Sequence, residues 1–371
     1  MRRRVAACAV TMAMTSLAVA SLGACAGSTT GDPVTDAGGL PTAAPADLGF
    51  DAKALDRLAD EAEQRGSSCF LVARQGKVVL ARYWNGAAAD SEQEVYSVTK
   101  SVTSTLVGLA QADGDLSIDD PASAYIGDWR GTPSEAVTVR QLLSGVSGRF
   151  WSEESDYTRL IEAADRTAYA VGLDQQADPG TLWVYNNAAV QTLDRVLRSA
   201  TGTDPAALAE ERLFAPLGMD HTRMTQDDSG HSTNVFFGLQ STCTDLARFG
   251  TLFAQDGRWE GRQVVPRAWV REATGGPSQP LNAAYGLLWW LNRKGSVRPP
   301  GGGDAAQLVP DAPEQLFAAQ GLGGQVVLVD PRSDTVVVRL GAAEGAGPDE
   351  YQIADAARVI TEALSYDTGV P

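Results

Sequence analysis

Ser97 and Lys100 form the first pair of residues whose types and spacing could carry out chemistry. They stand three positions apart at the start of a segment with helical periodicity, so their side chains would share one helix face. A serine hydroxyl is a weak nucleophile that needs a neighbouring base, and a lysine with a depressed pKa can serve as that base. The start of a helix also favours developing negative charge. The alternative is a solvated serine–lysine pair on a helix surface.

A second group of candidate residues lies at Tyr185 and Asn187, after a Pro-Gly turn and before a predicted helix over 187–200. A tyrosinate held next to a lysine could act as a general base, and an asparagine could hydrogen-bond a substrate amide. Taken alone, Tyr185 is more often a core tyrosine whose hydroxyl finds a partner within the fold.

The elements that must position these residues follow the order strands, then helices, then strands. Helices are expected over 51–65, 97–112, 187–200, 204–213, 243–254 and 350–365, with a short one at 138–143. Strands are expected over 69–73, 77–82, 285–291, 316–320, 325–329 and 335–340. The predicted fold class is α+β, in the form of an α/β sandwich. Both ends of the chain would build an antiparallel sheet flanked by helices, into which a mostly helical lobe is inserted.

The two groups together resemble the first two motifs of the class C β-lactamase-like serine hydrolases. That superfamily includes penicillin-binding DD-peptidases, esterases and aminohexanoate-dimer hydrolases. The resemblance spans about residues 50–345, and the flanking segments that agree with it are 116–121, 137–148 and 238–250. It implies a β-lactamase/transpeptidase-like fold.

The resemblance also implies roles for individual residues. Ser97 would be the nucleophile that forms an acyl-enzyme, and Lys100 and Tyr185 would share the acid/base work. Asn187 would orient the substrate. No metal ion and no organic cofactor are implied.

The third motif of that superfamily, K-T-G or H-x-G on a late strand, has no direct counterpart. Leu322, Gly323 and Gly324 stand where the triplet is expected, just before a predicted strand. The oxyanion hole would then be formed by the backbone N–H groups of Ser97 and Gln325. For this segment alone, a glycine-rich turn is the other interpretation.

The departure at Leu322 bears on the substrate. A lysine in the third motif supplies positive charge for a substrate carboxylate, and Leu322 supplies none, although arginines could act locally. Neutral esters or amides are therefore favoured, and efficient β-lactamase activity is not expected. The sequence predicts a serine hydrolase of a small-molecule or peptide substrate. The alternatives are a DD-peptidase, or a non-catalytic module that binds cell-wall peptide.

The N-terminal sequence predicts an export signal. Arg2 to Arg4 precede an uncharged apolar run, and Cys25 follows in a context that resembles a bacterial lipobox. Residues 1–24 would be the signal peptide, 25–47 a flexible linker and 48–371 the hydrolase domain. Acylation of Cys25 would anchor the protein in the outer face of the cell membrane, outside the cytoplasm. A plain secretory signal or a permanent transmembrane helix are the alternatives.

Cys69 and Cys243 are the two cysteines of the predicted exported domain. An oxidising compartment would favour a disulfide between them, and two buried free thiols are the alternative.

Composition excludes several classes of function. The 371 residues include 30 Lys and Arg against 46 Asp and Glu, which gives a net charge of −16. A nucleic-acid partner is therefore not expected, because phosphate contacts need basic surfaces. The 2 histidines are too few for a two-metal hydrolase, so no metal site is predicted.

Overall fold

The structure is a computed structural model that describes residues 34–300, 302–342 and 350–365. The chain divides into two units, residues 1–32 and residues 33–371, and all described residues belong to the second. The predicted signal peptide, Cys25 and the first part of the linker lie outside the described residues. The export signal and the lipid anchor therefore stay predictions. No described helix combines the length and the apolar character needed to cross a membrane.

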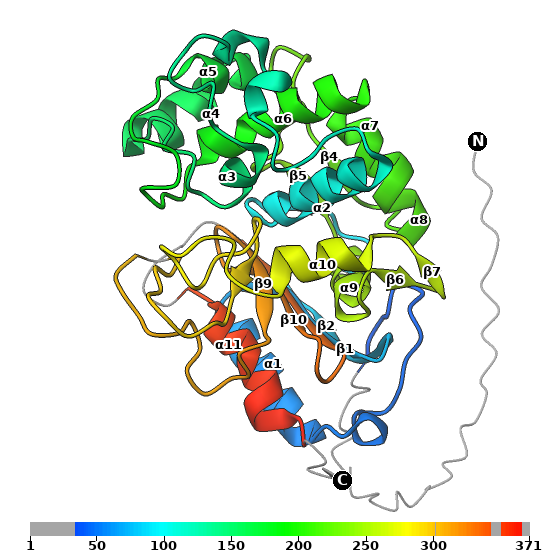
Figure 1. Ribbon diagram of the computed structural model, residues 1–371. Coiled ribbons are helices and arrows are strands. Elements are labelled where there is room, and N and C mark those ends of the chain that lie inside the picture. Colours follow the sequence, from blue (N-terminus) through cyan, green and yellow to red (C-terminus); the bar gives the residue numbers. More distant parts are fainter. Residues whose placement is uncertain (1–33, 301, 343–349, 366–371) are drawn as a thin grey trace, which may run out of the picture. The chain divides into compact units, whose positions relative to one another are not determined.

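A six-stranded sheet forms the centre of the described unit (Figure 1). Its strands are β1 (Ser67–Arg74), β2 (Lys77–Tyr83), β8 (Trp290–Leu291), β9 (Phe317–Gly321), β10 (Gln325–Asp330) and β11 (Thr335–Gly341). They run in the order β2-β1-β11-β10-β9-β8, with every neighbouring pair antiparallel. The first two strands thus lie beside the last ones, as the sequence predicts.

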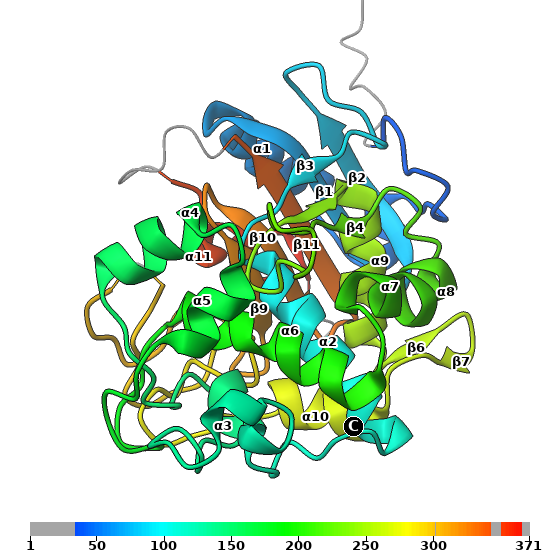
Figure 2. The ribbon, with the colours of Figure 1, turned by 90° about the horizontal axis from the view of Figure 1, so that it is seen from above.

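Helices cover both faces of this sheet. Every residue of β10 and β11 is buried, which requires apolar cover above and below. Helix α1 (Ala52–Gln64) lies on one side in Figure 2, and α2 (Val98–Asp113) and α9 (Cys243–Ala254) lie on the other. Helix α11 (Ile353–Arg358), which continues as a π-helical turn, packs on β10 and β11.

The helical lobe is inserted between β2 and the late strands. Its helices are α2, α3 (Val139–Leu143), α4 (Leu160–Glu162), α5 (Arg166–Gly172), α6 (Asn187–Thr201), α7 (Pro205–Ala209) and α8 (Ala215–Leu217). The lobe also contains a small three-stranded sheet in the order β3 (Gln93–Glu94), β5 (Leu239–Ser241) and β4 (Arg223–Met224). The remaining strands and α-helix are a two-stranded ribbon, β6 (Arg258–Trp259) with β7 (Arg262–Gln263), and α10 (Arg267–Thr274).

The predicted strand over 285–291 is wrong for most of its length. Only Trp290 and Leu291 pair with β9, because the chain folds back on itself before them. Leu288 adopts a left-handed φ of 59°, and Tyr285 forms an isolated bridge with Trp290. The apolar run reads as a strand in sequence, but it is a tight turn whose aromatic side chains are buried.

The predicted flexible linker does not hold for residues 34–47. This segment lies along β2, where Val34 bridges Ala81 and Thr42 bridges Val78. Further backbone hydrogen bonds join the same stretch to this edge strand. The edge strand of a sheet leaves N–H and C=O groups unpaired. Here the Pro/Gly-rich segment forms hydrogen bonds with some of these groups on β2.

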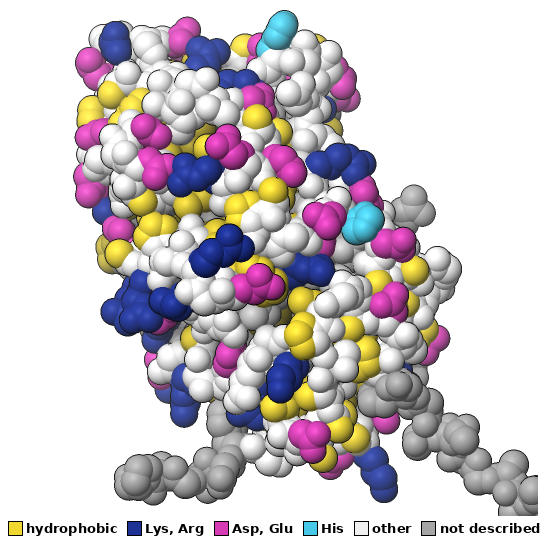
Figure 3. All heavy atoms as spheres, turned by 90° about the vertical axis from the view of Figure 1, so that its right-hand side faces the viewer, with side chains coloured by type: hydrophobic (Ala, Val, Ile, Leu, Met, Phe, Trp, Pro, Cys, Tyr) yellow, Lys and Arg dark blue, Asp and Glu magenta, His cyan; other side chains and the backbone are white. Residues whose placement is uncertain are grey.

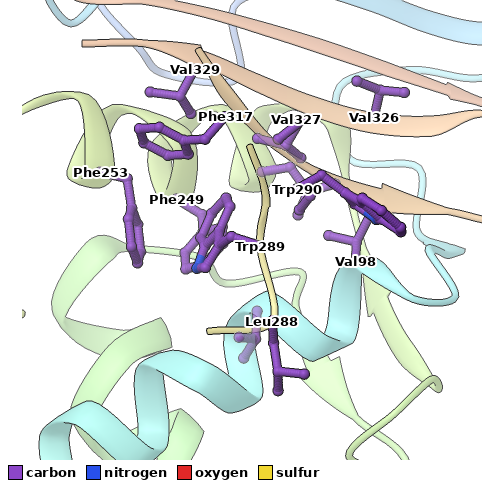
Figure 4. Close-up of a cluster of buried hydrophobic side chains, with 14 of the residues drawn as sticks. Val98, Phe249, Phe253, Leu288, Trp289, Trp290, Phe317, Val326, Val327 and Val329 are labelled. Carbon is purple, nitrogen blue, oxygen red and sulfur yellow. The ribbon is translucent and has the colours of Figure 1, made fainter. Parts of the chain in front are cut away.

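An aromatic cluster beneath the sheet fixes the first turn of α2 (Figure 4). Trp289 is fully buried and packs against Phe249, Phe253 and Phe317, with ring centroids 4.5 to 5.7 Å apart. Val98, the residue after Ser97, belongs to the same core. Burial of this side chain holds the helix start in one position.

The structure contains a disulfide between Cys69 of β1 and Cys243, the first residue of α9. Their Cα atoms lie 6.4 Å apart, and both residues are buried. The bond joins the central sheet to the helix that covers it.

Acidic and basic side chains are interspersed on the face of the molecule drawn in Figure 3. Many of the arginines form ion pairs with neighbouring carboxylates, such as Arg212 with Asp113 and Arg140 with Glu272. These pairs neutralise much of the local positive charge.

Candidate active site

The turn before α2 places Ser97 and Lys100 together. Tyr96 adopts a left-handed φ of 48°, which costs free energy for a residue with a Cβ, and Ser97 follows as the N-cap of the helix. Lys100 is 2 % exposed, and its Nζ donates hydrogen bonds to Ser97 Oγ at 2.8 Å and to the Phe236 carbonyl at 2.9 Å. The predicted helical spacing thus brings the amine to the hydroxyl in a buried site.

Tyr185 completes this group from the lobe, just before α6. Its ring lies 4.8 Å from Lys100 Nζ, and its hydroxyl is hydrogen-bonded to Ser97. The ring stacks on Trp290 with a centroid distance of 5.8 Å and meets the edge of Tyr285 at 6.2 Å. The structure therefore brings together all three residues that the sequence proposes for the chemistry.

Burial shifts the two titratable partners of Ser97 in opposite directions. It lowers the pKa of Lys100 to about 7, although the nearby Asp156 carboxylate opposes this shift. It raises the pKa of the Tyr185 hydroxyl above its usual value, against the hydrogen bond with Ser97. At neutral pH a large fraction of Lys100 is therefore an uncharged amine, while Tyr185 keeps its proton.

Asn187 lies in the first turn of α6, where a buried carboxylate caps the helix. Asp156 is 1 % exposed and accepts hydrogen bonds from the backbone N–H of Asn187 at 3.0 Å and of Ala188 at 2.9 Å. Among the residues that the structure describes, the side-chain oxygen of Asn187 is buried and has no hydrogen-bond partner. Asn187 is buried and does not line the cleft, so the predicted role in orienting the substrate stays a prediction.

Sequence reasoning missed Asp156. It lies on a π-helical turn, η4 (Ser155–Arg159), and also accepts a hydrogen bond from Trp151 Nε1 at 3.2 Å. π-Helical turns are often found at functional sites. No local pattern marks this aspartate as a helix cap, because the N–H groups that it caps lie about thirty residues further along the chain.

A cleft of about 490 Å³ opens above Ser97. Aromatic side chains form much of its wall, and they are Trp151, Tyr157, Trp183, Tyr185 and Trp290. Tyr157 is 54 % exposed and comes from the same π-helical turn as Asp156. A cleft of this size and character fits a small, partly apolar molecule.

The third motif lies at this cleft in a different register from the predicted one. Leu322 lines the cleft and is 56 % exposed, but Gly323, Gly324 and Gln325 are not among the lining residues. Gln325 is fully buried at the start of β10, where its side chain binds the carbonyls of Leu322 and Gly341. These three residues therefore do not form part of the cleft wall.

Gly321, at the end of β9, is the glycine that approaches the nucleophile. A Cβ at this position would lie 2.2 Å from the Val95 carbonyl oxygen and 3.2 Å from the Ser97 nitrogen. In the described part of the chain, the backbone N–H groups of Ser97 and Leu322 have no acceptor. The free backbone donors beside the nucleophile are therefore those of Ser97 and Leu322, and the pair that the sequence predicts for an oxyanion hole is Ser97 and Gln325.

Metal-binding clusters and histidines offer no second candidate centre in the described ranges. Within the described ranges, no cluster of three or more His, Cys, Asp or Glu side chains could hold a metal ion. Both histidines are exposed and neither lines the cleft.

Comparisons with known proteins identify the family of the chain. The family model described as "Beta-lactamase" matches residues 55–362. The 6-aminohexanoate-dimer hydrolase of Paenarthrobacter ureafaciens is 25 % identical over 315 residues, which cover 77 % of this chain and 75 % of that protein.

Solved structures of the same fold confirm the predicted fold class. A class C beta-lactamase superposes with a TM-score of 0.61 at 18 % identity, covering 84 % of this chain and 97 % of that one. A family VIII carboxylesterase superposes with a TM-score of 0.62 at 16 % identity, covering 85 % and 98 %. At these identities the likeness shows the fold alone.

Proposed function

The chain belongs to the beta-lactamase family of serine hydrolases, and on this premise we propose that it cleaves an ester or amide bond through an acyl-enzyme on Ser97. One observation carries the proposal. The buried amine of Lys100 lies 2.8 Å from Ser97 Oγ, and its pKa is lowered to about 7. A base next to a serine hydroxyl and poised near neutral pH is what nucleophilic catalysis needs.

Acylation then proceeds with each proton accounted for. Ser97 Oγ attacks the substrate carbonyl carbon, and its proton passes to the amine of Lys100. The carbonyl oxygen becomes an oxyanion that accepts hydrogen bonds from the N–H groups of Ser97 and Leu322. When the bond to the leaving group breaks, the Tyr185 hydroxyl hands over its proton to that group and regains one from Lys100.

Deacylation reverses the path with water. A water molecule attacks the acyl carbonyl and gives its proton to Lys100, and Ser97 Oγ leaves with a proton as the acid is released. Lys100 is the first base in this scheme, because burial keeps Tyr185 protonated at neutral pH.

Esters and amides are favoured over β-lactams as substrates. The β9–β10 hairpin that carries the third motif has no charged residue from 317 to 325, and the cleft wall is largely aromatic. The relative from Paenarthrobacter is named for the hydrolysis of an aminohexanoate dimer. This supports an acyl-transfer reaction on a small substrate, while a DD-peptidase remains the alternative within the same chemistry.

The acyl-enzyme itself tests the proposal. The full chain is mixed with excess p-nitrophenyl acetate, quenched with acid and digested, and the peptides are analysed by mass spectrometry. We expect a burst of nitrophenol and one added acetyl group on Ser97. The Ser104→Ala variant, which removes a buried hydroxyl without a described partner on the same helix, is expected to be labelled equally. The absence of label, or label on another residue, contradicts the mechanism and favours a binding module.

The pH profile tests the role of Lys100. Its protonated form cannot accept the Ser97 proton, so kcat/KM for a neutral ester is expected to fall about tenfold per pH unit below pH 7. Above pH 7 the rate should level off, and no loss is expected up to about pH 9 because the pKa of Tyr185 is raised. Asp156 is the carboxyl group that faces Lys100. An acid limb centred near the pKa of a carboxyl group would identify that residue as the base instead.

A further inference from the structure

One charged side chain of the cleft has no part in this chemistry. Arg298 lies on the loop that follows β8 and lines the cleft together with Trp183 and Tyr185. Its Nη1 donates a long hydrogen bond of 3.5 Å to the carbonyl of Trp183. Among the described residues, no carboxylate lies within ion-pair distance of this guanidinium. Most of its donors are therefore available to a ligand.

The rest of the described cleft wall contains little charge. Among the described residues that line the cleft, Arg298 is the one positively charged residue and Glu350 is the one acidic residue. The other lining residues are aromatic, aliphatic, amide or hydroxyl side chains, with glycines and prolines. The third motif adds no positive charge, because residues 317–325 of the β9–β10 hairpin are all uncharged.

An arginine in this setting fits one kind of group in particular. The guanidinium presents several N–H donors in a planar fork that matches the two oxygens of a carboxylate. Arg298 is an exposed residue, so a ligand in the cleft can reach its guanidinium. Ser97 lines the same cleft, so this charge and the nucleophile face one substrate site.

We propose that Arg298 binds a carboxylate of the substrate, so that the enzyme prefers esters or amides that carry a carboxylate to neutral ones. This inference rests on the proposed function and narrows its substrate class. It revises the sequence-based expectation of neutral substrates, because the positive charge comes from a loop that no motif marks.

Two matched pairs of esters test the inference. The first pair, mono-p-nitrophenyl terephthalate and p-nitrophenyl 4-carbamoylbenzoate, differs by a carboxylate on the acyl side. The second, 4-carboxyphenyl butyrate and 4-carbamoylphenyl butyrate, differs by one on the leaving group. The measured quantity is the ratio of kcat/KM for the carboxylate ester to kcat/KM for its carbamoyl partner. Comparing this ratio between variants cancels the intrinsic reactivity of each ester.

Arg298→Gln is expected to lower this ratio at least about tenfold for one of the two pairs, since a charge-assisted hydrogen bond is lost. Arg298→Lys, which keeps the charge without the fork, should give an intermediate ratio. Arg293→Gln is the matched control, because Arg293 lies on the same loop and donates to Gly275 away from the cleft. An unchanged ratio for both pairs in Arg298→Gln overturns the inference.

A binding measurement separates this inference from the proposed function. Calorimetry on the Ser97→Ala variant compares monomethyl terephthalate with methyl 4-carbamoylbenzoate, with and without the added Arg298→Gln substitution. We expect the carboxylate to bind at least about tenfold more tightly only while Arg298 is present. Equal affinity, or no binding of either compound, overturns the role of Arg298. If the parent hydrolyses no ester or amide, the proposed function fails, and this comparison still decides the binding role.

Discussion

Ser97→Ala and Lys100→Met are each expected to lower kcat/KM for ester hydrolysis at least about 10³-fold, and the double variant is expected to be no worse than either. The two side chains act as one unit, because the amine is useful only where it can take the proton of this hydroxyl. Steady-state kinetics of the three variants with one p-nitrophenyl ester provide the measurement. A Lys100→Met variant that keeps a tenth of the parent activity would remove Lys100 from the role of base.

Loss of fold must be separated from loss of chemistry in these variants. The pKa of Lys100 is about 7 in the folded protein, below its value of 10.5 in an unfolded chain. The unfolded state therefore binds the extra proton between these values, and the parent loses stability as the pH falls from 10.5 towards 7. Lys100→Met removes this cost, so its melting temperature at pH 7 is expected to equal or exceed that of the parent. Ser104→Ala provides the control on the same helix and should keep activity within about twofold of the parent.

The parts of the site that could be predicted are those fixed by short-range geometry. Ser97 and Lys100 share a helix face whatever else the chain does, and the burial of Val98 fixes that helix against the core. Tyr185 was found through its resemblance to a family motif. The position of its ring over Lys100 depends on packing against Trp290, which no local pattern specifies.

The third motif shows why the register of a hairpin is harder to predict than the presence of the hairpin. The sequence marks a glycine-rich hairpin correctly, but glycines occur at both ends of its turn. Which one faces Ser97 depends on how closely β9 approaches the turn before α2. The close contact of Gly321 with the Val95 carbonyl decides this, and such a long-range contact leaves no trace in the local sequence.

The fold was predicted in its main features for a related reason. Apolar runs at both ends of the chain must bury two faces, which leads to one sheet with helices on each side. The predictions that are wrong concern segments whose amino-acid composition suggests one structure while their tertiary contacts impose another. Residues 34–47 have the composition of a linker but meet the open edge of β2, and the apolar run before Trp290 turns sharply at Leu288.

The disulfide gives the second large expected effect, on stability. Cys69 and Cys243 are separated by 174 residues, so their bond closes a very long loop in the unfolded chain. The loop-entropy relation gives about 5 kcal/mol of stabilisation for a loop of this length, as an upper value. For a domain of this size, that corresponds to a fall of about 7 °C in melting temperature when both cysteines are replaced by alanine.

Calorimetric or fluorescence melting of Cys69→Ala/Cys243→Ala beside the parent provides the measurement. A reducing agent should lower the melting temperature of the parent by a similar amount and leave that of the double variant unchanged. Neither cysteine lines the cleft, so the esterase activity of the double variant well below its melting temperature should stay within about twofold of the parent. Equal melting temperatures of parent and double variant would contradict the expected stabilisation. They would mean that residual structure already restricts the unfolded chain, so that the bond removes little further conformational freedom from it.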